Sequence, residues 1–267
     1  MAFELHEDVR VLVVSYDEHK RSQASFFDEG VDAEYEINRP RGTPNFHRWL
    51  LNEKFRRSIE KISDDLQGAS VLTICGGSGL DAEFIATSGA SVLCTDISIG
   101  AAKRAATRAA RFGVQYEVAV ADAEALPFPD RSFDFVYVHD GLHHLEQPIR
   151  GVAEMARVAR QGICITEPAR AAMTRISVLA GVSTDAEDAG NAVRRLREGD
   201  VRDALEAAGF SAKLARRYLM YYRHEPGLAT RVLSPRYASA AGRAAFRLAN
   251  ALGGRVGNKL TIQAVRR

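Results

Sequence analysis

The strongest indication of the fold is one glycine-containing segment, Val71-Leu-Thr-Ile-Cys-Gly-Gly-Ser-Gly-Leu-Asp-Ala82. Its first four residues predict a buried strand, and the glycines that follow allow a sharp turn into a helix that begins near Asp81. This order places unpaired backbone N–H groups at the helix N-terminus, where they can bind a nucleotide-like ligand. The spacing from Gly77 to Ala82 also fits the dinucleotide-binding pattern GxGxxG/A, so the segment alone does not choose the cofactor.

Short apolar runs alternate with helical patterns from this segment to the end of the chain. Strands are predicted at residues 71–74, 91–95, 116–120, 133–138, 163–166, 214–222 and 259–265. Helices are predicted at residues 49–66, from about 81, and at 101–111, 149–159 and 200–208. This alternation is typical of βαβ units, and therefore of a doubly wound, Rossmann-like α/β fold with a mostly parallel, seven-stranded sheet.

The composition is that of an ordinary globular protein. Of 267 residues, 46% are hydrophobic and 26% are charged, which argues against disorder. The net charge of +2 gives no overall case for nucleic-acid or membrane binding. The apolar runs are too short for a transmembrane helix, and the acidic, polar residues 1–10 predict no signal peptide, so we expect a cytoplasmic protein. Three cysteines without CxxC spacing predict neither a disulfide framework nor a cysteine-ligated metal.

The charge is distributed unevenly along the chain. Twelve Lys and Arg residues lie between Lys213 and Arg267, and only Glu225 opposes them. This concentration can attract an anionic ligand or surface, or it can be neutralised by the acidic residues at 28–36.

A second segment indicates which cofactor is bound. It is Val120-Ala-Asp-Ala-Glu-Ala-Leu-Pro-Phe-Pro-Asp-Arg-Ser-Phe-Asp-Phe-Val-Tyr-Val138. Its Asp-Ala pair, Leu-Pro-Phe and Ser-Phe-Asp resemble, in that order, the class I S-adenosylmethionine-dependent methyltransferases. The continuation from Asp140 to Glu146 is similar to the Leu-His-His-Leu segment of small-molecule methyltransferases. The resemblance covers residues 70–168 closely and implies a final strand antiparallel to the others.

The resemblance also implies roles for individual residues. Asp96 would hold both ribose hydroxyls, Ile97 would pack on adenine, and Asp122 would accept from the adenine amino group. The full implied set for S-adenosylmethionine, and for its product S-adenosylhomocysteine, is Cys75, Gly76, Gly77, Gly79, Asp96, Ile97, Asp122, Ala123, His139 and Asp140. The chain departs from the family pattern at Thr73, where an acidic residue is usual, and at Cys75, where glycine is usual. Asp96 and Asp122 also fit a purely structural role as strand-end carboxylates that cap turns.

Two insertions are expected to interrupt one α/β core and to form a helical cap. The predicted parts are an N-terminal helical lid at 1–69, the cofactor-binding core at 70–168, a cap insertion at 169–199, core again at 200–224, a basic helical cap insertion at 225–257 and a final strand at 258–267. Both insertions leave from the carboxyl edge of the sheet, where parallel sheets bind ligands. We therefore expect them, with residues 16–50, to cover the methyl donor.

The candidates for catalysis are His143, His144 and Tyr222, and those for acceptor binding are Glu167, Tyr221, Arg223 and His224. A histidine base is needed only if the acceptor must lose a proton, so His143 and His144 also fit a packing role. The aromatic and basic residues at 217–225 equally fit an edge strand with arginines extended toward solvent.

The resulting interpretation is methyl transfer to a small-molecule acceptor, with an oxygen acceptor favoured and an anionic one suggested by clustered arginines. Four alternatives stay open. They are an RNA or protein methyltransferase that uses the basic C-terminal third, a lipid or quinone methyltransferase at a membrane surface with residues 237–252 as an interfacial helix, a degenerate cofactor-binding regulator, and a nicotinamide-dependent dehydrogenase. The sequence does not indicate the oligomeric state.

Overall fold

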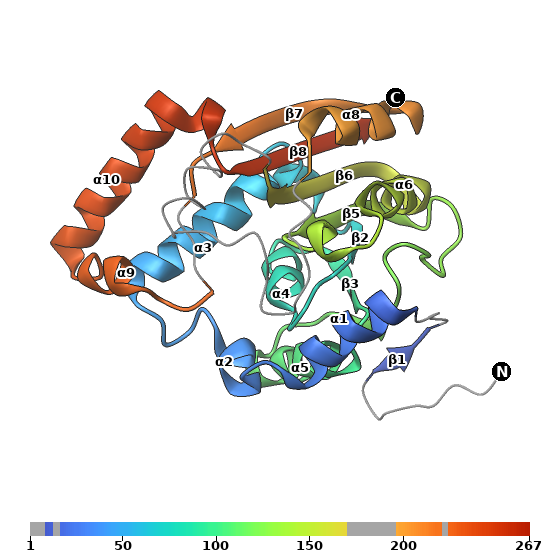
Figure 1. The fold of residues 1–267 in the computed structure, drawn as a ribbon, viewed down its shortest axis with the longest axis horizontal. Helices are drawn as coiled ribbons and strands as arrows, with labels where there is room; N and C mark the ends of the chain where they lie inside the picture. Colours follow the sequence, from blue (N-terminus) through green and yellow to red (C-terminus); the bar gives the residue numbers. More distant parts are fainter. Residues whose placement is uncertain (1–8, 13–16, 170–195, 221–223) are drawn as a thin grey trace.

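The computed structural model describes residues 9–12, 17–169, 196–220 and 224–267. These residues form an eight-stranded sheet with helices on both faces (Figure 1). The strands are β1 (Arg10–Val11), β2 (Ser70–Thr73), β3 (Ser91–Asp96), β4 (Glu117–Val120), β5 (Phe133–His139), β6 (Ala159–Pro168), β7 (Phe210–Tyr218) and β8 (Lys259–Arg266). The longer helices are α1 (Glu18–Glu29), α2 (Ala33–Asn38), α3 (Asn45–Ser58), α4 (Leu80–Ala86), α5 (Ile99–Phe112), α6 (Pro148–Val158), α8 (Glu198–Ala207), α9 (Leu228–Val232) and α10 (Arg236–Gly253). Three short 3₁₀ helices are η1 (Ser63–Asp65), η2 (Leu142–His144) and η3 (Gly254–Val256).

The strand order is β1-β4-β3-β2-β5-β6-β8-β7. All neighbouring pairs are parallel except those of β8, which runs antiparallel between β6 and β7. The predicted Rossmann-like sheet with its antiparallel last strand is confirmed. The structure adds β1, a two-residue edge strand parallel to β4, which is too short to give a sequence pattern.

Two apolar layers enclose the sheet. On one face, Val152 and Met155 of α6 and Leu205 of α8 pack with the strands, all of them at most 1% exposed. On the other face, α4 and α5 pack through Ile85 and Ala105, which are fully buried. Each face of the sheet is therefore covered by a buried apolar layer.

Local signals fix several helix starts. Asp17 caps α1 by accepting a hydrogen bond from Lys20 N at 2.8 Å, and Asp32 caps α2 by accepting from Tyr35 N at 3.0 Å. Ser98 caps α5 through Ala101 N at 2.8 Å. α1 and α2 both contact α5, at the bottom of the view in Figure 1.

Some predicted boundaries of helices and strands were wrong. The predicted helix at 49–66 begins earlier, at Asn45, and ends at Ser58, because the chain then turns through η1. The predicted strand at 214–222 begins four residues earlier, at Phe210, which is fully buried. Most of the predicted cap insertion at 169–199 lies outside the described residues.

Candidate functional site: a cavity at the carboxyl edge of the sheet

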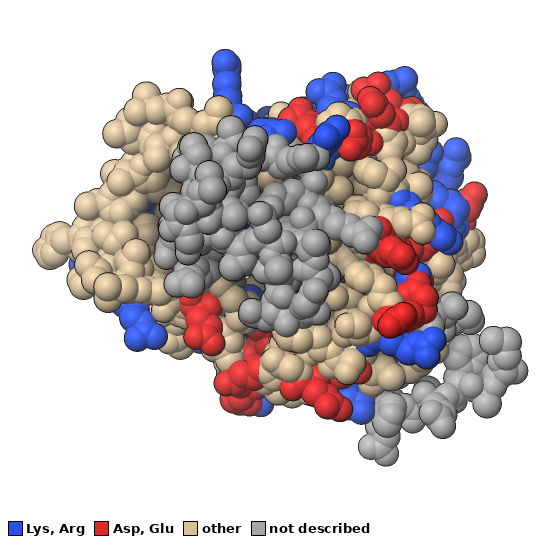
Figure 2. All heavy atoms as spheres, viewed as in Figure 1, with Lys and Arg blue, Asp and Glu red and all other residues tan. Residues whose placement is uncertain are grey.

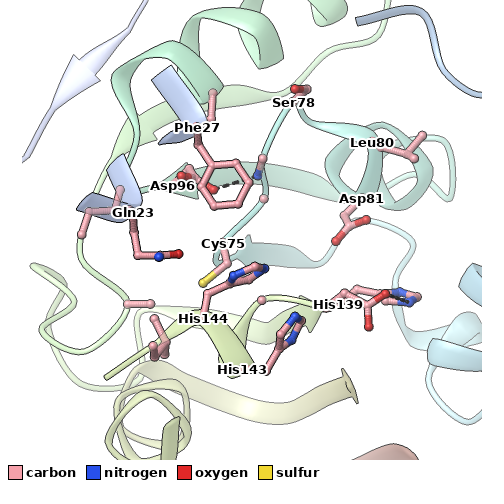
Figure 3. Close-up of a pocket in the computed structure, with 18 of the residues that line it drawn as sticks. Gln23, Phe27, Cys75, Ser78, Leu80, Asp81, Asp96, His139, His143 and His144 are labelled. Carbon is pink, nitrogen blue, oxygen red and sulfur yellow. Dashed lines mark hydrogen bonds and ion pairs between the residues drawn. The ribbon is translucent and has the colours of Figure 1, made fainter. Parts of the chain in front are cut away.

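The turn between β2 and α4 forms one wall of a cavity of about 520 Å³. Gly77 has a φ of +53°, and a side chain there would be strained. Its N–H donates to Asp96 Oδ2 at 2.9 Å, drawn as a dashed line in Figure 3. Asp96 Oδ1 accepts from Ser98 N, also at 2.9 Å. Burial raises the pKa of Asp96, and these two backbone hydrogen bonds oppose that rise.

Asp122 lies on the same wall and is paired with the N-terminal helix. Its Oδ1 accepts from Glu124 N at 2.9 Å, and its Oδ2 lies 2.6 Å from Lys20 Nζ. Lys20 also approaches Glu124 Oε2 at 3.2 Å. A carboxylate offers about four lone-pair positions, so this pairing leaves Asp122 able to accept a further hydrogen bond.

Helices α1 and α2 close the cavity above these carboxylates. Gln23 and Phe27 of α1 and Glu36 of α2 line it, and Figure 3 draws Gln23 and Phe27 among the residues around the cavity. Arginines of α5 hold both helices in place. The fully buried Arg108 donates to backbone oxygens of residues 36, 37 and 39, and Arg104 to those of residues 27 and 28.

A charged cluster lies where β5 ends. Asp140 Oδ2 lies 2.6 Å from Lys54 Nζ, and Lys259 Nζ pairs with Asp140 Oδ1. Although burial opposes it, the charges of Lys259 and Lys54 hold the pKa of Asp140 well below its usual range. Asp140 has a φ of +55°, a conformation that Asp and Asn tolerate better than most residues.

His139 and Asp81 adjoin this cluster and line the cavity. His139 Nδ1 bonds Tyr137 OH at 2.9 Å, while Nε2 has no hydrogen-bond partner among the described residues. Burial, with the Lys54 charge, holds the pKa of His139 well below its usual value. Asp81 points into the cavity in Figure 3, and burial raises its pKa to about 7.

A histidine–carboxylate pair lies beside the cavity. Glu167 is fully buried, and its Oε1 accepts from the backbone N–H groups of Gly141 and Leu142, both at 2.8 Å. Its Oε2 lies 2.7 Å from His143 Nδ1. Gly141 must be glycine here, because a Cβ would lie 2.4 Å from Cβ of Cys75. Glu167 therefore shapes the loop that carries His143.

Comparison with known proteins adds the family. Residues 72–166 match the model of a family described as "Methyltransferase domain". The chain is 31% identical over 148 residues to a demethylmenaquinone methyltransferase of Renibacterium salmoninarum, covering 55% of this chain and 58% of that protein. It is 41% identical over 98 residues to the ubiquinone/menaquinone biosynthesis C-methyltransferase UbiE of Bordetella avium, covering 36% and 38%. The alignments with the first two curated relatives span about three fifths of their length.

The chain contains a class I S-adenosylmethionine-dependent methyltransferase domain. The fold agrees. A magnesium protoporphyrin IX methyltransferase from Synechocystis, solved with bound S-adenosylhomocysteine, superposes with a TM-score of 0.64 at 18% identity, covering 93% of this chain and all of that one.

Most residues expected to bind the cofactor lie together in the methyltransferase domain. All except Gly79 line the cavity, as do the catalytic candidates His143 and His144. His224 also lines it and pairs with Glu36. Burial raises the pKa of Glu36, but the interactions with His224 and the charge of Arg39 together outweigh it and hold that pKa at about 2. Glu167 is not on the cavity wall formed by the described residues, and Tyr221, Tyr222 and Arg223 lie outside them.

Sequence reasoning missed several polar residues that the fold brings to the cavity or to its buried carboxylates. Lys20, Lys54, Asp81 and Lys259 belong to four different elements, so no spacing along the chain connects them. Thr73, in the place of the usual acidic residue, is fully buried beneath the loop. Among the described residues, no group of three or more His, Cys, Asp or Glu is arranged to hold a metal ion.

Proposed function

We propose that the protein transfers the methyl group of S-adenosylmethionine to a ring carbon of a hydroxylated aromatic small molecule. The observation that carries this proposal is one cavity that joins the Gly77–Asp96 wall to the His143–Glu167 pair and the Lys54–Asp140–Lys259 cluster. When bound, S-adenosylmethionine supplies a methyl carbon activated by a sulfonium. The protein's own task is then to align the acceptor, to exclude water and to accept a proton.

The residues present fit this donor. The cavity volume lies within the usual range of small-molecule sites, roughly 300–1,000 Å³. Asp96 has lone pairs left for the ribose hydroxyls, and Asp122 has one for the adenine amino group. Asp81 supplies the carboxylate that the loop lacks at Thr73, and we assign it to the methionine ammonium.

The acceptor class follows from the opposite wall and from the relatives. Removing a proton from a ring hydroxyl makes the neighbouring ring carbon a better nucleophile. His143, held by Glu167 through Nδ1, is the candidate proton acceptor, and the lysines beside Asp140 favour a negative oxygen nearby. The curated relatives include a demethylmenaquinone methyltransferase and a C-methyltransferase, which supports attack by carbon rather than by the oxygen that the sequence alone favoured.

Binding and product analysis together test this function. Isothermal titration with S-adenosylmethionine, S-adenosylhomocysteine and NAD should give binding of the adenosyl sulfur compounds only. Asp96→Ala should weaken that binding about a hundredfold, through loss of two charge-assisted hydrogen bonds. Asp64→Ala, an exposed carboxylate on η1, is the matched control. NAD binding alone would overturn the assignment.

The acceptor experiment uses reduced demethylmenaquinone, whose ring carries two hydroxyls. Nuclear magnetic resonance of the product separates a carbon-bound from an oxygen-bound methyl group. An oxygen-bound methyl would contradict the proposed carbon acceptor while leaving the cofactor assignment intact.

A further inference from the structure

Helix α10 exposes the side that a surface helix normally buries. Ser239 and Gly242 are buried, and Asn250 bonds the backbone N and O of Leu219 at 2.9 and 3.1 Å. The face turned to solvent carries Tyr237, Leu248 and Leu252, which are 90%, 60% and 82% exposed. Surface helices place their apolar face toward the core, so this arrangement is inverted.

The exposed face of α10 is an apolar stripe whose residues recur at the spacing of the helical turn. Tyr237, Ala241, Ala244, Leu248 and Leu252 follow each other at spacings of four, three, four and four residues, and all are exposed. Leu228 and Val232 just before this helix and Val256 just after it are exposed as well. Of the seven large apolar side chains that the described ranges expose, six lie between residues 228 and 256.

The same segment carries only positive charge. Arg231, Arg236, Arg247 and Arg255 are exposed, and the sequence has no Asp or Glu from Pro226 to Arg267. In Figure 2 the edge of the molecule over α10, on the left, is predominantly tan. An exposed apolar stripe flanked by arginines, with no carboxylate nearby, matches a surface that is apolar inside and anionic outside.

We propose that α10 docks on the surface of an anionic lipid bilayer, with Tyr237, Leu248 and Leu252 inserted among the lipids and Arg236 and Arg247 at the phosphates. A second copy of the chain fits this face less well, because a symmetric contact would bring the same arginines together without carboxylates to offset them. No helix in the described part of the chain is long and apolar enough to cross a membrane, so this contact is peripheral.

The docking helix stands apart from the cavity. Of the cavity-lining residues that the structure describes, none lies between 225 and 257, whereas the sequence led us to expect this insertion as a cap over the methyl donor. α10 instead packs on α3, where Phe246 meets Trp49 edge-on with 5.3 Å between ring centroids. This inference goes beyond the proposed function, and membrane binding is measurable without cofactor or acceptor.

Vesicle sedimentation tests the proposal. The full chain should sediment with vesicles of phosphatidylcholine and phosphatidylglycerol, and much less with phosphatidylcholine alone, and added salt should weaken the binding. Leu248→Ser with Leu252→Ser should lower the partition coefficient about tenfold or more. Arg236→Gln with Arg247→Gln should lower it on anionic vesicles only.

The controls separate docking from folding. Ile149→Ser, on α6, removes the one exposed large apolar side chain that the described residues carry outside 228–256, and it should leave sedimentation unchanged. Trp49 is the sole tryptophan and touches Phe246, so its fluorescence reports whether α10 is still docked in each variant. Absence of binding to anionic vesicles, or unchanged binding by the leucine variant, would overturn the proposal. A dimer in sedimentation velocity that the leucine variant dissociates, without vesicle binding, would instead assign the stripe to self-association.

Discussion

The ammonium of Lys20 lies 2.6 Å from Oδ2 of Asp122, which joins the N-terminal helix α1 to the wall of the cavity. The side chains of Asp122 and Glu124 are only 4% and 3% exposed, and Lys20 approaches both of them. A residue of α1 thus provides the counter-charge for two buried carboxylates of the core. The placement of α1 is therefore part of the site and not merely a cover.

We predict that Lys20→Met lowers the free energy of unfolding by about 2 kcal/mol at neutral pH, because two buried carboxylates lose their partner. Burial lowers the pKa of Lys20, but its hydrogen bonds to Asp122 and Glu124 raise it above the ordinary value. The stabilisation is therefore fully present below about pH 10.5 and is lost as the pH rises through the raised pKa.

Thermal and urea unfolding across pH check this prediction. The deficit of Lys20→Met should be full at neutral pH and should shrink as the pH rises through the raised pKa of Lys20. Lys103→Met, at an exposed position of α5, should leave the unfolding free energy almost unchanged. Equal effects of the two substitutions would contradict the role given to Lys20.

For Asp81 we predict pH-dependent binding of S-adenosylhomocysteine, which carries the same amino-acid end as the methyl donor. Burial raises the Asp81 pKa to about 7, so the carboxylate that would face the ammonium is lost as the pH falls through 7. Affinity at pH 6 should be about tenfold lower than at pH 8. Titration calorimetry of Asp81→Asn should give weaker binding without this slope. If Asp81→Asn keeps the pH dependence of affinity that the unsubstituted protein shows, another group is responsible for it. The control Asp64→Asn should bind as the unsubstituted protein does.

Glu167 is predicted to act through His143 as a positioning residue. Glu167→Gln keeps an oxygen for the N–H groups of Gly141 and Leu142 but presents an amide to His143 Nδ1, which favours the wrong tautomer. We expect kcat to fall about a hundredfold, with a shifted pH–rate profile and an unchanged Kd for S-adenosylmethionine. The control is Glu154→Gln, since Glu154 also accepts a backbone hydrogen bond, from Leu126 N, but is not a cavity residue. A purely structural Glu167 would lower Tm and leave the pH profile in place.

Asp140→Asn should destabilise the protein by about 3 kcal/mol, because Lys54 and Lys259 then face each other almost buried, at 7% and 9% side-chain exposure. Asparagine tolerates the φ of +55°, so the backbone is not the cause. Burial already lowers the pKa of Lys259, and loss of the carboxylate lowers it further, so the variant should regain stability as the pH rises. Unfolding curves at several pH values measure this.

Asp130→Asn, in an exposed pair with Arg157, should cost less than about 0.5 kcal/mol. If the stability lost in Asp140→Asn did not depend on pH, the charge of the buried lysines would not be its cause.

The sequence by itself determined the sheet, the glycine loop and the positions of Asp96 and Asp122. Buried parallel strands are continuous apolar runs, and the turns between them need glycine or capping residues at fixed spacings, so these features are local and readable. The same locality explains why the short β1 and the true start of β7 were missed, since neighbouring strands decide both.

Only the tertiary structure decided which charges meet. Lys54 and Lys259 meet Asp140 at the end of β5, with Asp81 adjoining them, and Lys20 meets Asp122. These contacts form because the fold brings distant segments to one edge of the sheet. It also decided that the apolar stripe of α10 faces outward, since helical spacing gives the width of a stripe and not its direction. Direction, burial and charge pairing depend on long-range packing, and no period in the sequence encodes them.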